Sequence, residues 1–365
     1  MKLYLISGED SGDMHGANLV KALKNKVPDL QLRGIGGERL IEQGLIHLAH
    51  VRDINYMGFV EIVQHLRVFR RLFRTIKQDI QTWRPDAVVL IDYPGFNLRM
   101  APFIKSLGIP VIFYISPQVW AWKKGRVKKI KRCVDRMLVI LPFEVDFYQQ
   151  EGMEVDFVGH PLLDELKPVD HRPTQPPTIA LLPGSRKQEI LRVLPSLLAL
   201  PDRFPDHRFV IGGAPSQTEE FYRALIPADK RVELVMDQTH ALLQQADYAV
   251  VSSGTATLET ALFEVPEVVV YRGSAISFWL AKRLVKVPFI SLVNLIMGES
   301  LVEELLQGEC NPNRISQALK RLMQPTKNAQ IKAGYQLLRE KLGREGASEK
   351  AAEIVASFDD ASFDN

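Results

Sequence analysis

Hydrophobic positions in the N-terminal half of the chain form short aliphatic and β-branched runs that alternate with stretches of helical periodicity. These runs predict strands at residues 3–7, 31–35, 87–92, 111–116, 137–141 and 155–159. Residues 87–91 are apolar without interruption, which is typical of a strand that helices cover on both faces of a parallel sheet. The alternation therefore predicts a Rossmann-like, doubly wound α/β domain over residues 1–168.

The same alternation returns after a proline-rich polar stretch at residues 167–177, which we interpret as an interdomain linker. A second Rossmann-like domain is predicted over residues 178–330, with strands at residues 178–182, 208–211, 232–235, 248–252 and 267–271. Helices without further strands follow, and those at 331–358 could pack back across the domain junction. Two such domains facing one another would bind ligands beyond the carboxyl ends of their strands.

Composition narrows the class of protein without changing this picture. A length of 365 residues agrees with two domains, and 46% hydrophobic with 24% charged residues is typical of a globular chain. Cys133 and Cys310 are far apart and indicate neither a disulfide framework nor a thiolate metal site, in agreement with a reducing cytoplasm. No window approaches the roughly 18 to 20 apolar residues that cross a bilayer, so any membrane contact is expected to be peripheral.

Two strand-to-helix turns in the second half predict an anion site. Each places glycine and hydroxyl residues where a helix N-terminus can donate backbone N–H groups to a phosphate, and Arg186 adds a bidentate cation. Either turn alone is equally compatible with a plain connection, but two at neighbouring strand ends can hold one diphosphate. Glu259 could accept hydrogen bonds from a ribose, or could merely favour the helix dipole. The predicted set is Gly184, Ser185, Arg186, Ser253, Gly254, Thr255, Thr257 and Glu259.

A loop at residues 7–16 gathers glycine, hydroxyl and carboxylate groups after the first strand. It could bind the hydroxyls of a sugar substrate, with Ser11 and Gly12 among the contacts, or supply a base through Glu9 or Asp13. The alternative is an elaborate helix cap. The loop matches no dinucleotide, Walker A or hydrolase motif, and without D-x-D or EF-hand spacing it predicts no metal site.

Asp92 ends the apolar strand at residues 87–92 and is a candidate general base. Asn97 follows closely and is a candidate contact of the substrate from which such a base would take a proton. Asp92 could equally cap the helix that follows.

Aromatic residues after the strand at 111–116 could line a sugar or acyl site. Gln118, Trp120 and Trp122 are the candidates, although core packing would also explain a tryptophan. Seven basic residues follow within 123–132, in a chain whose net charge is only +3. No nucleic-acid-binding module surrounds them, so we expect no nucleic-acid partner. A solvated face, or attraction to an anionic membrane or a phosphorylated acceptor, is favoured.

The segment at residues 60–83 interleaves apolar side chains with arginines and predicts a basic amphipathic helix. Its apolar stripe, with Phe69, Leu72 and Phe73, suits a helix that contacts lipid at an interface. An ordinary core-facing helix produces the same stripe.

Taken together, the motifs resemble the lipid-A-disaccharide synthase family over nearly the whole chain. They are SGEDSGDMHG at 7–16, SPQVWAW at 116–122, LPFE at 141–144, VGHP at 158–161, LPGSR at 182–186 and SGTATLE at 253–259. The similarity continues through residues 279–295 to 303–307. The resemblance implies a GT-B fold, which consists of two facing Rossmann-like domains with a C-terminal helical segment.

The resemblance also implies an activity. Members transfer 2,3-diacylglucosamine, with inversion and without a metal, from UDP-2,3-diacylglucosamine to the 6-hydroxyl of 2,3-diacylglucosamine 1-phosphate. The products are UDP and lipid A disaccharide 1-phosphate. No cofactor is expected beyond the UDP-sugar donor, and the implied location is cytoplasmic, peripheral at the inner face of the inner membrane. A homo-oligomer is compatible with this assignment.

By the same resemblance, Arg186 and the two helix N-termini stabilise the departing UDP, Asn294 contributes to the donor site, and Asp92 is the favoured base. The chain has Gly95 where many members have a second aspartate, so Asp92 acts alone or Glu9 or Asp13 takes part. Val293 stands where a proline is usual.

Two alternatives remain at this stage. One is another UDP-sugar enzyme of GT-B fold, such as a lipid-carrier glycosyltransferase or a UDP-N-acetylglucosamine 2-epimerase. The other is a non-catalytic UDP-sugar-binding protein.

Overall fold

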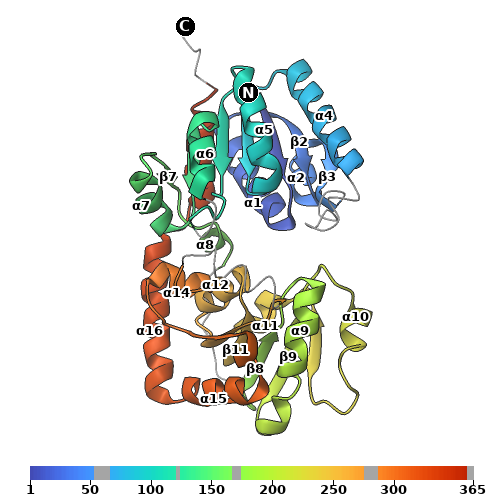
Figure 1. Cartoon of the computed structure of the whole chain (residues 1–365), viewed down its shortest axis with the longest axis vertical. Helices are drawn as coiled ribbons and strands as arrows, with labels where there is room; N and C mark the ends of the chain where they lie inside the picture. Colours follow the sequence, from blue (N-terminus) through green and yellow to red (C-terminus); the bar gives the residue numbers. More distant parts are fainter. Residues whose placement is uncertain (53–65, 121–123, 167–173, 275–286, 360–365) are drawn as a thin grey trace. The chain divides into compact units, whose positions relative to one another are not determined.

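The computed structural model describes residues 1–52, 66–120, 124–166, 174–274 and 287–359, and the side chains of 66–69 and 124 are outside the description. The chain divides into two compact units. The first unit comprises Met1–Asp164 with Leu342–Asn365, and the second comprises Glu165–Lys341. Each unit contains one parallel sheet with helices on its faces (Figure 1).

The sheet of the first unit has seven parallel strands in the order β3-β2-β1-β4-β5-β6-β7. Their bounds are β1 Lys2–Ser7, β2 Gln31–Gly36, β3 Ile46–His50, β4 Ala87–Ile91, β5 Val111–Tyr114, β6 Arg136–Val139 and β7 Asp156–Phe157. The strand order reverses between β1 and β4, which pair directly. In doubly wound sheets, ligands bind beyond the carboxyl ends of the strands at this point.

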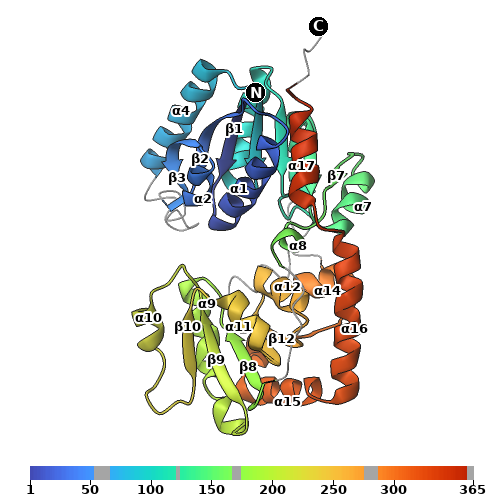
Figure 2. The ribbon, with the colours of Figure 1, turned by 180° about the vertical axis from the view of Figure 1, so that it is seen from behind.

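Eight helices in the described part of the first unit surround this sheet. They are α1 Asp10–Lys24, α2 Glu38–Glu42, α4 Leu66–Trp83, α5 Pro94–Ser106, α6 Val127–Cys133, α7 Pro142–Gln150, α8 Leu162–Glu165, which ends at the unit boundary, and α17 Ala347–Ala356. Helices α4, α5 and α6 lie side by side on one face (Figure 1). Helices α1 and α17 cover the other face (Figure 2).

The C-terminal helix α17 is fixed to the first unit by capping and ion pairs. The carboxylate of Asp164 accepts backbone N–H groups at the start of α17, among them Gly346 at 2.6 Å and Ser348 at 2.9 Å. The terminal ammonium of Met1 lies 3.3 Å from Asp359. Helix α17 therefore belongs to the same compact unit as the N-terminal strand β1.

The sheet of the second unit has six parallel strands in the order β10-β9-β8-β11-β12-β13. Their bounds are β8 Thr178–Leu182, β9 Arg208–Gly213, β10 Glu233–Met236, β11 Tyr248–Ser252, β12 Glu267–Tyr271 and β13 Glu303–Leu306. The order reverses between β8 and β11, which pair directly. The two turns predicted to bind a diphosphate follow these two strands.

The described helices of the second unit are α9 Lys187–Leu197, α10 Glu219–Arg223, α11 Thr239–Gln245, α12 Thr255–Leu262, α14 Leu292–Met297, α15 Pro312–Leu322 and α16 Pro325–Leu342, the last ending at the unit boundary. Short 3₁₀ helices occur at Lys124–Arg126 in the first unit and at Pro201–Arg203 and Gln307–Glu309 in the second. Within the described ranges, no helix is both long and apolar enough to span a bilayer.

The structure contains two strands that the hydrophobic pattern does not predict. Strand β3 is an edge strand whose first two residues are exposed, so it lacks a continuous apolar run. Strand β13 contains Glu303 and Glu304, residue types that are depleted in strands. The Glu304 carboxylate accepts the backbone N–H groups of Ile290 and Ser291 at about 3 Å, so a tertiary contact accommodates this charge.

Candidate functional site

A cavity of about 300 Å³ opens at the carboxyl ends of β8 and β11 in the second unit. Six residues of the predicted diphosphate site line it, namely Gly184, Ser185, Ser253, Gly254, Thr255 and Glu259. The N-termini of α9 and α12 begin at its edge. Helix N-termini and glycine-rich turns favour anions, so this cavity has the features of a phosphate site.

The first turn depends on a glycine. Gly184 has a φ of +108°, a backbone angle that residues with a side chain rarely adopt. A Cβ on Gly184 would lie 2.3 Å from Oε2 of Glu189. Arg186 is exposed and is the N-cap residue of α9. The carbonyl of Ser185 accepts the hydroxyl of Ser216 at 2.6 Å. The turn is thus anchored while the Arg186 side chain faces solvent.

The second turn is held by its own hydroxyl groups. Ser253 Oγ donates to the carbonyl of Ile290 at 3.0 Å. Thr257 is completely buried, and its hydroxyl donates to the carbonyl of Gly254 at 2.8 Å. Thr257 therefore stabilises the turn from beneath instead of contacting a ligand, which corrects its predicted role. Thr255 is exposed at the start of α12.

Glu259 lies at the edge of the cavity beside a histidine that the sequence did not indicate. Its carboxylate is 3.6 Å from Nε2 of His240, and its side chain is 20% exposed. Interaction with the Glu259 carboxylate raises the pKa of His240, an effect that partial burial opposes. The Glu259 carboxylate thus lies beside the imidazole and remains partly exposed.

Asn294 is fully buried and does not line the cavity. Its amide nitrogen donates to the carbonyl of Val302 and to Glu304, both at 2.9 Å, and its oxygen accepts the N–H of Val302 at 3.0 Å. These hydrogen bonds of the Asn294 side chain stabilise the connection between α14 and β13. In this structure, the Asn294 side chain serves the packing of the second unit and does not reach the cavity.

In the first unit, Asp92 and Glu9 come together at the carboxyl ends of β4 and β1. Burial, and then the charge of Glu9, raise the pKa of Asp92 to about 7. Asp92 and Tyr93 both have a φ of 44°, a left-handed conformation that costs free energy for residues other than glycine. A Cβ on Gly8 would lie 2.2 Å from the Tyr93 ring, so the two loops pack closely. Asp92 has the environment of a base that titrates near neutral pH.

Asp13 is a helix cap rather than a candidate base. Its carboxylate accepts the backbone N–H groups of Gly37 at 2.5 Å, Arg39 at 3.0 Å and Leu40 at 3.3 Å, at the start of α2. These bonds occupy a buried carboxylate that the sequence treated as potentially catalytic. The reason is tertiary, because Gly37, the N-cap residue of α2, lies 24 residues further along the chain.

Asn97 is also structural. It is completely buried, and its amide nitrogen donates to the carbonyls of Ile6, Ile91 and Asp92 at 3.3, 3.2 and 2.8 Å. It therefore joins the ends of β1 and β4 and supports Asp92 from below, instead of contacting an acceptor.

The two neighbouring loop candidates differ in accessibility. Ser11 is exposed, whereas Gly12 is buried close to the Ser7 hydroxyl, where a Cβ would lie 2.7 Å from the oxygen.

Gln118 is exposed and Trp120 half-buried after β5, while Trp122 lies outside the described residues. The Trp120 indole packs edge-on against Phe143, with ring centroids 4.8 Å apart. Its Nε1 donates to Glu144, a buried carboxyl group that the sequence did not single out. These contacts fix the orientation of the Trp120 side chain in the segment after β5.

The apolar stripe of α4 faces the core where it is described. Leu72 and Phe73 pack against the buried cluster of the first unit, and the Phe73 ring lies 5.1 Å from that of Phe96. Arg70, Arg71 and Arg74 are exposed. The expected lipid contact through Leu72 and Phe73 is therefore replaced by core packing, and the Phe69 side chain lies outside the description.

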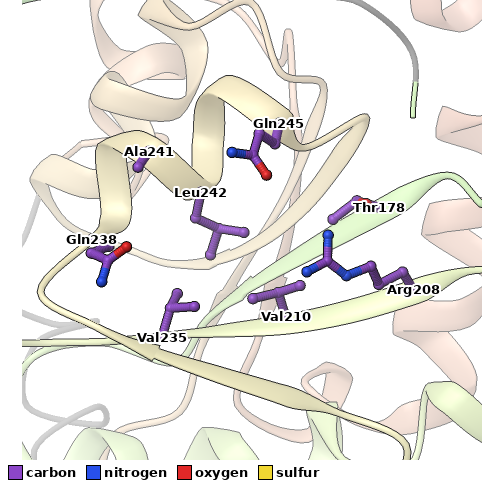
Figure 3. A pocket seen from close by; sticks show the side chains of 8 residues that line it. All are labelled: Thr178, Arg208, Val210, Val235, Gln238, Ala241, Leu242 and Gln245. Carbon is purple, nitrogen blue, oxygen red and sulfur yellow. The ribbon is translucent and has the colours of Figure 1, made fainter. Parts of the chain in front are cut away.

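A smaller cavity of about 70 Å³ lies between α11 and strands β8, β9 and β10 (Figure 3). Its lining is Thr178, Arg208, Val210, Val235, Gln238, Ala241, Leu242 and Gln245. The Arg208 guanidinium is committed to Glu233, with Nε 2.7 Å from Oε1. This cavity is too small for a sugar nucleotide.

Among the described residues, no group of three or more His, Cys, Asp or Glu side chains could hold a metal ion.

Comparison with known proteins adds an independent result. The family model of lipid-A-disaccharide synthetase matches residues 3–358. A lipid-A-disaccharide synthase of Syntrophus aciditrophicus is 42% identical over 372 residues, which cover 98% of this chain and 97% of that protein. The synthase of Geobacter sulfurreducens is 39% identical over 369 residues, with 97% and 96% covered.

Solved structures of lower identity have the same fold. A co-structure of S. aureus MnaA with UDP has a TM-score of 0.67 at 16% identity, covering 97% of this chain and 94% of that one. The glycotransferase of kitacinnamycin also has a TM-score of 0.67, at 15% identity and 98% coverage of both chains.

Proposed function

The chain belongs to the lipid-A-disaccharide synthetase family, and from this premise we propose that it transfers 2,3-diacylglucosamine from UDP-2,3-diacylglucosamine to 2,3-diacylglucosamine 1-phosphate. It is a glycosyltransferase of GT-B fold. The observation that carries the substrate proposal is the donor cavity of the second unit. There, two glycine-containing turns and two helix N-termini line a single space of about 300 Å³.

The donor half of the reaction follows from the chemistry of this cavity. As the bond from the anomeric carbon to the diphosphate breaks, negative charge accumulates on the departing UDP. The α9 and α12 N-termini supply fixed positive dipoles, and Arg186 supplies a mobile cation. Glu259 at the cavity edge would accept the ribose hydroxyls. This set of groups would stabilise the leaving group without a metal.

The acceptor half requires a base for the 6-hydroxyl proton. We assign this role to Asp92, whose raised pKa allows it to take a proton near neutral pH. Glu9 contributes by raising that pKa. Gly95 carries no carboxylate and Asp13 is engaged as a helix cap, so Asp92 and Glu9 are the two predicted acids that we assign to the base function.

We also assign a peripheral membrane location at the cytoplasmic face of the inner membrane, because both substrates carry acyl chains. The exposed cations of the α4 and α6 layer support this assignment, since basic residues attract anionic lipid headgroups. They include Arg70, Arg71, Arg74, Lys128 and Lys131. Sedimentation with anionic and with neutral vesicles tests it, and equal binding to both would contradict the electrostatic argument.

The test of the activity is direct. Purified protein is incubated with UDP-2,3-diacylglucosamine and 2,3-diacylglucosamine 1-phosphate, and the disaccharide phosphate and UDP are measured by mass spectrometry. Absence of both products would refute the proposed reaction. Conversion of UDP-N-acetylglucosamine without any acceptor would instead indicate an epimerase, and UDP binding without turnover would indicate a binding protein.

Arg186→Ala tests the leaving-group argument. We expect kcat/KM to fall by about 10²- to 10³-fold, the effect of losing one donor to a developing anion. Arg192→Ala is the matched control, because Arg192 lies within the helix, bonded to Gln188, whereas Arg186 is the N-cap residue. Equal activity of the two variants would exclude a role for Arg186.

A further inference from the structure

We propose that Glu189 is a positioning residue that connects the two turns of the donor cavity and fixes their spacing. This inference rests on the proposed function, because it gives the connection a role in binding the diphosphate of the donor. Glu189 was not indicated by the sequence. Glu189 lines the cavity together with residues of the turn after β8 and of the turn after β11.

The contacts of Glu189 reach both turns. Its Oε1 accepts a hydrogen bond of 2.7 Å from the hydroxyl of Ser252, the last residue of β11. Its Oε2 lies against the first turn, since a Cβ on Gly184 would be only 2.3 Å from it. Ser252 is 3% exposed, so its hydroxyl is directed inward to this carboxylate. One side chain thus contacts the segments that precede both helices.

Electrostatics argue against a direct contact between Glu189 and the phosphates. A carboxylate repels a diphosphate, and the cavity otherwise offers helix N-termini that attract one. The negative charge is favourable for a different reason, because Glu189 is the third residue of α9 and interacts with the positive end of its dipole. The placement fits a group that organises the cavity and leaves phosphate binding to the turns.

The connection matters because the hydroxyls of the two serines at the end of β11 are engaged within the protein. Ser252 donates to Glu189, and Ser253 donates to the carbonyl of Ile290. The phosphates are therefore left to the N-termini of α9 and α12, together with the exposed side chains of Arg186 and Thr255. Two helix ends bind one diphosphate only if their separation is correct. The Glu189–Ser252 hydrogen bond sets that separation.

A double-mutant cycle tests this proposal. Dissociation constants for UDP are measured by calorimetry on the full chain for Glu189→Ala, Ser252→Ala and the double variant. We expect each single variant to bind UDP about tenfold more weakly, and the double variant to bind no more weakly than the worse single one, because both remove the same bond. Additive losses would overturn the proposal.

Two further measurements distinguish positioning from general damage. Glu189→Gln keeps an oxygen that can accept from Ser252, so it should bind UDP within about threefold of the wild type. Uridine, which lacks phosphates, should bind all variants equally. A Gln variant as weak as Glu189→Ala would indicate that the charge itself contacts the donor, and equal losses for uridine would indicate damage to the domain. Either result overturns the positioning role.

The control is Gln188→Ala, which alters an exposed neighbour in the same helical turn and should leave the UDP constant unchanged. Thermal melting of each variant verifies folding, and the conservative Glu189→Gln and Ser252→Ala variants remain informative if Glu189→Ala does not fold. Failure of the wild type to bind UDP would refute the proposed function. Wild-type binding of UDP that Glu189→Ala matches would refute this inference alone.

Discussion

The indole Nε1 of Trp120 donates a hydrogen bond of 3.2 Å to Oε1 of Glu144, a carboxyl group that is only 1% exposed. The other oxygen of Glu144 accepts the backbone N–H of Leu141 at 3.1 Å. Burial raises the pKa of Glu144 to about 7, although its hydrogen bonds oppose the shift. The orientation of an aromatic side chain beside the proposed acceptor loop thus depends on one buried acid.

Replacing Glu144 should destabilise the first unit. Glu144→Ala leaves the half-buried indole N–H of Trp120 and the buried backbone N–H of Leu141 without their acceptor, so we expect the free energy of unfolding to fall by about 2–4 kcal/mol. Urea denaturation at pH 8 measures it. Glu154→Ala, at an exposed site of the same unit, should change stability by less than about 0.5 kcal/mol. Similar values for the two variants would contradict the assigned role of Glu144.

Asp92 should give the reaction an acidic limb near pH 7. Its pKa of about 7 means that the carboxylate is lost as pH falls through this value, and a protonated Asp92 is not a base. We expect kcat/KM to fall about tenfold per pH unit below the limb. Asp92→Asn should lower kcat by about 10²- to 10⁴-fold.

Glu9→Gln provides the discriminating variant for this assignment. Removing the Glu9 charge removes one cause of the raised pKa, so the limb should move to lower pH. A limb that stays in place in Glu9→Gln would mean that another group controls it.

His240 should make UDP binding depend on pH. Glu259 raises the pKa of His240, so the imidazolium is present below that pKa and disappears as pH rises through it. A cation beside the cavity favours the diphosphate, and we expect the dissociation constant for UDP to rise by about two- to fivefold from this source with increasing pH. In His240→Asn this component should vanish. His207→Asn, whose ring packs on Phe204, should retain it.

Glu267 should make the second unit less stable as pH rises. Its side chain is fully buried at the start of β12, and neither carboxylate oxygen has a hydrogen-bond partner among the described residues. Burial raises its pKa well above the usual value, so the folded state retains a proton that the unfolded state releases. The stability from this proton is complete below the unfolded pKa and decreases as pH rises, by up to about 1.4 kcal/mol per unit.

The glutamine in Glu267→Gln does not titrate. The free energy of unfolding of this variant should therefore depend less on pH. Urea denaturation of both proteins between pH 6 and 9 measures the difference. Parallel curves would show that Glu267 ionises equally in the two states.

Local patterns were sufficient for the elements that have a strong local cause. The apolar runs predicted β4 and β11 because buried parallel strands exclude polar side chains. The strand–glycine–helix patterns around Gly184 and Gly254 predicted anion turns because backbone geometry there depends on neighbouring residues in the chain. Strand β13 was missed because Glu304 lowers strand propensity, and its carboxylate is accommodated only by the loop at Ile290.

The roles of polar residues were harder to predict for a related reason. Asp13, Asn97 and Asn294 are residue types that serve equally as ligands and as caps, and a sequence does not reveal which backbone groups surround them. Each turned out to satisfy buried backbone groups beyond its own turn of the chain. Buried backbone groups require partners, so many polar side chains near a site serve the fold.

The sequence by itself determined the family, the two parallel α/β domains and the two turns that line the donor cavity. The family follows from the resemblance of an ordered set of motifs, and the domains and turns follow from local periodicity. Only the tertiary structure decided which acids remain available for chemistry. Asp13 became a helix cap, Asp92 acquired a raised pKa and Glu189 came to connect the two turns, because burial, charge and hydrogen-bond partners depend on segments that only folding brings together.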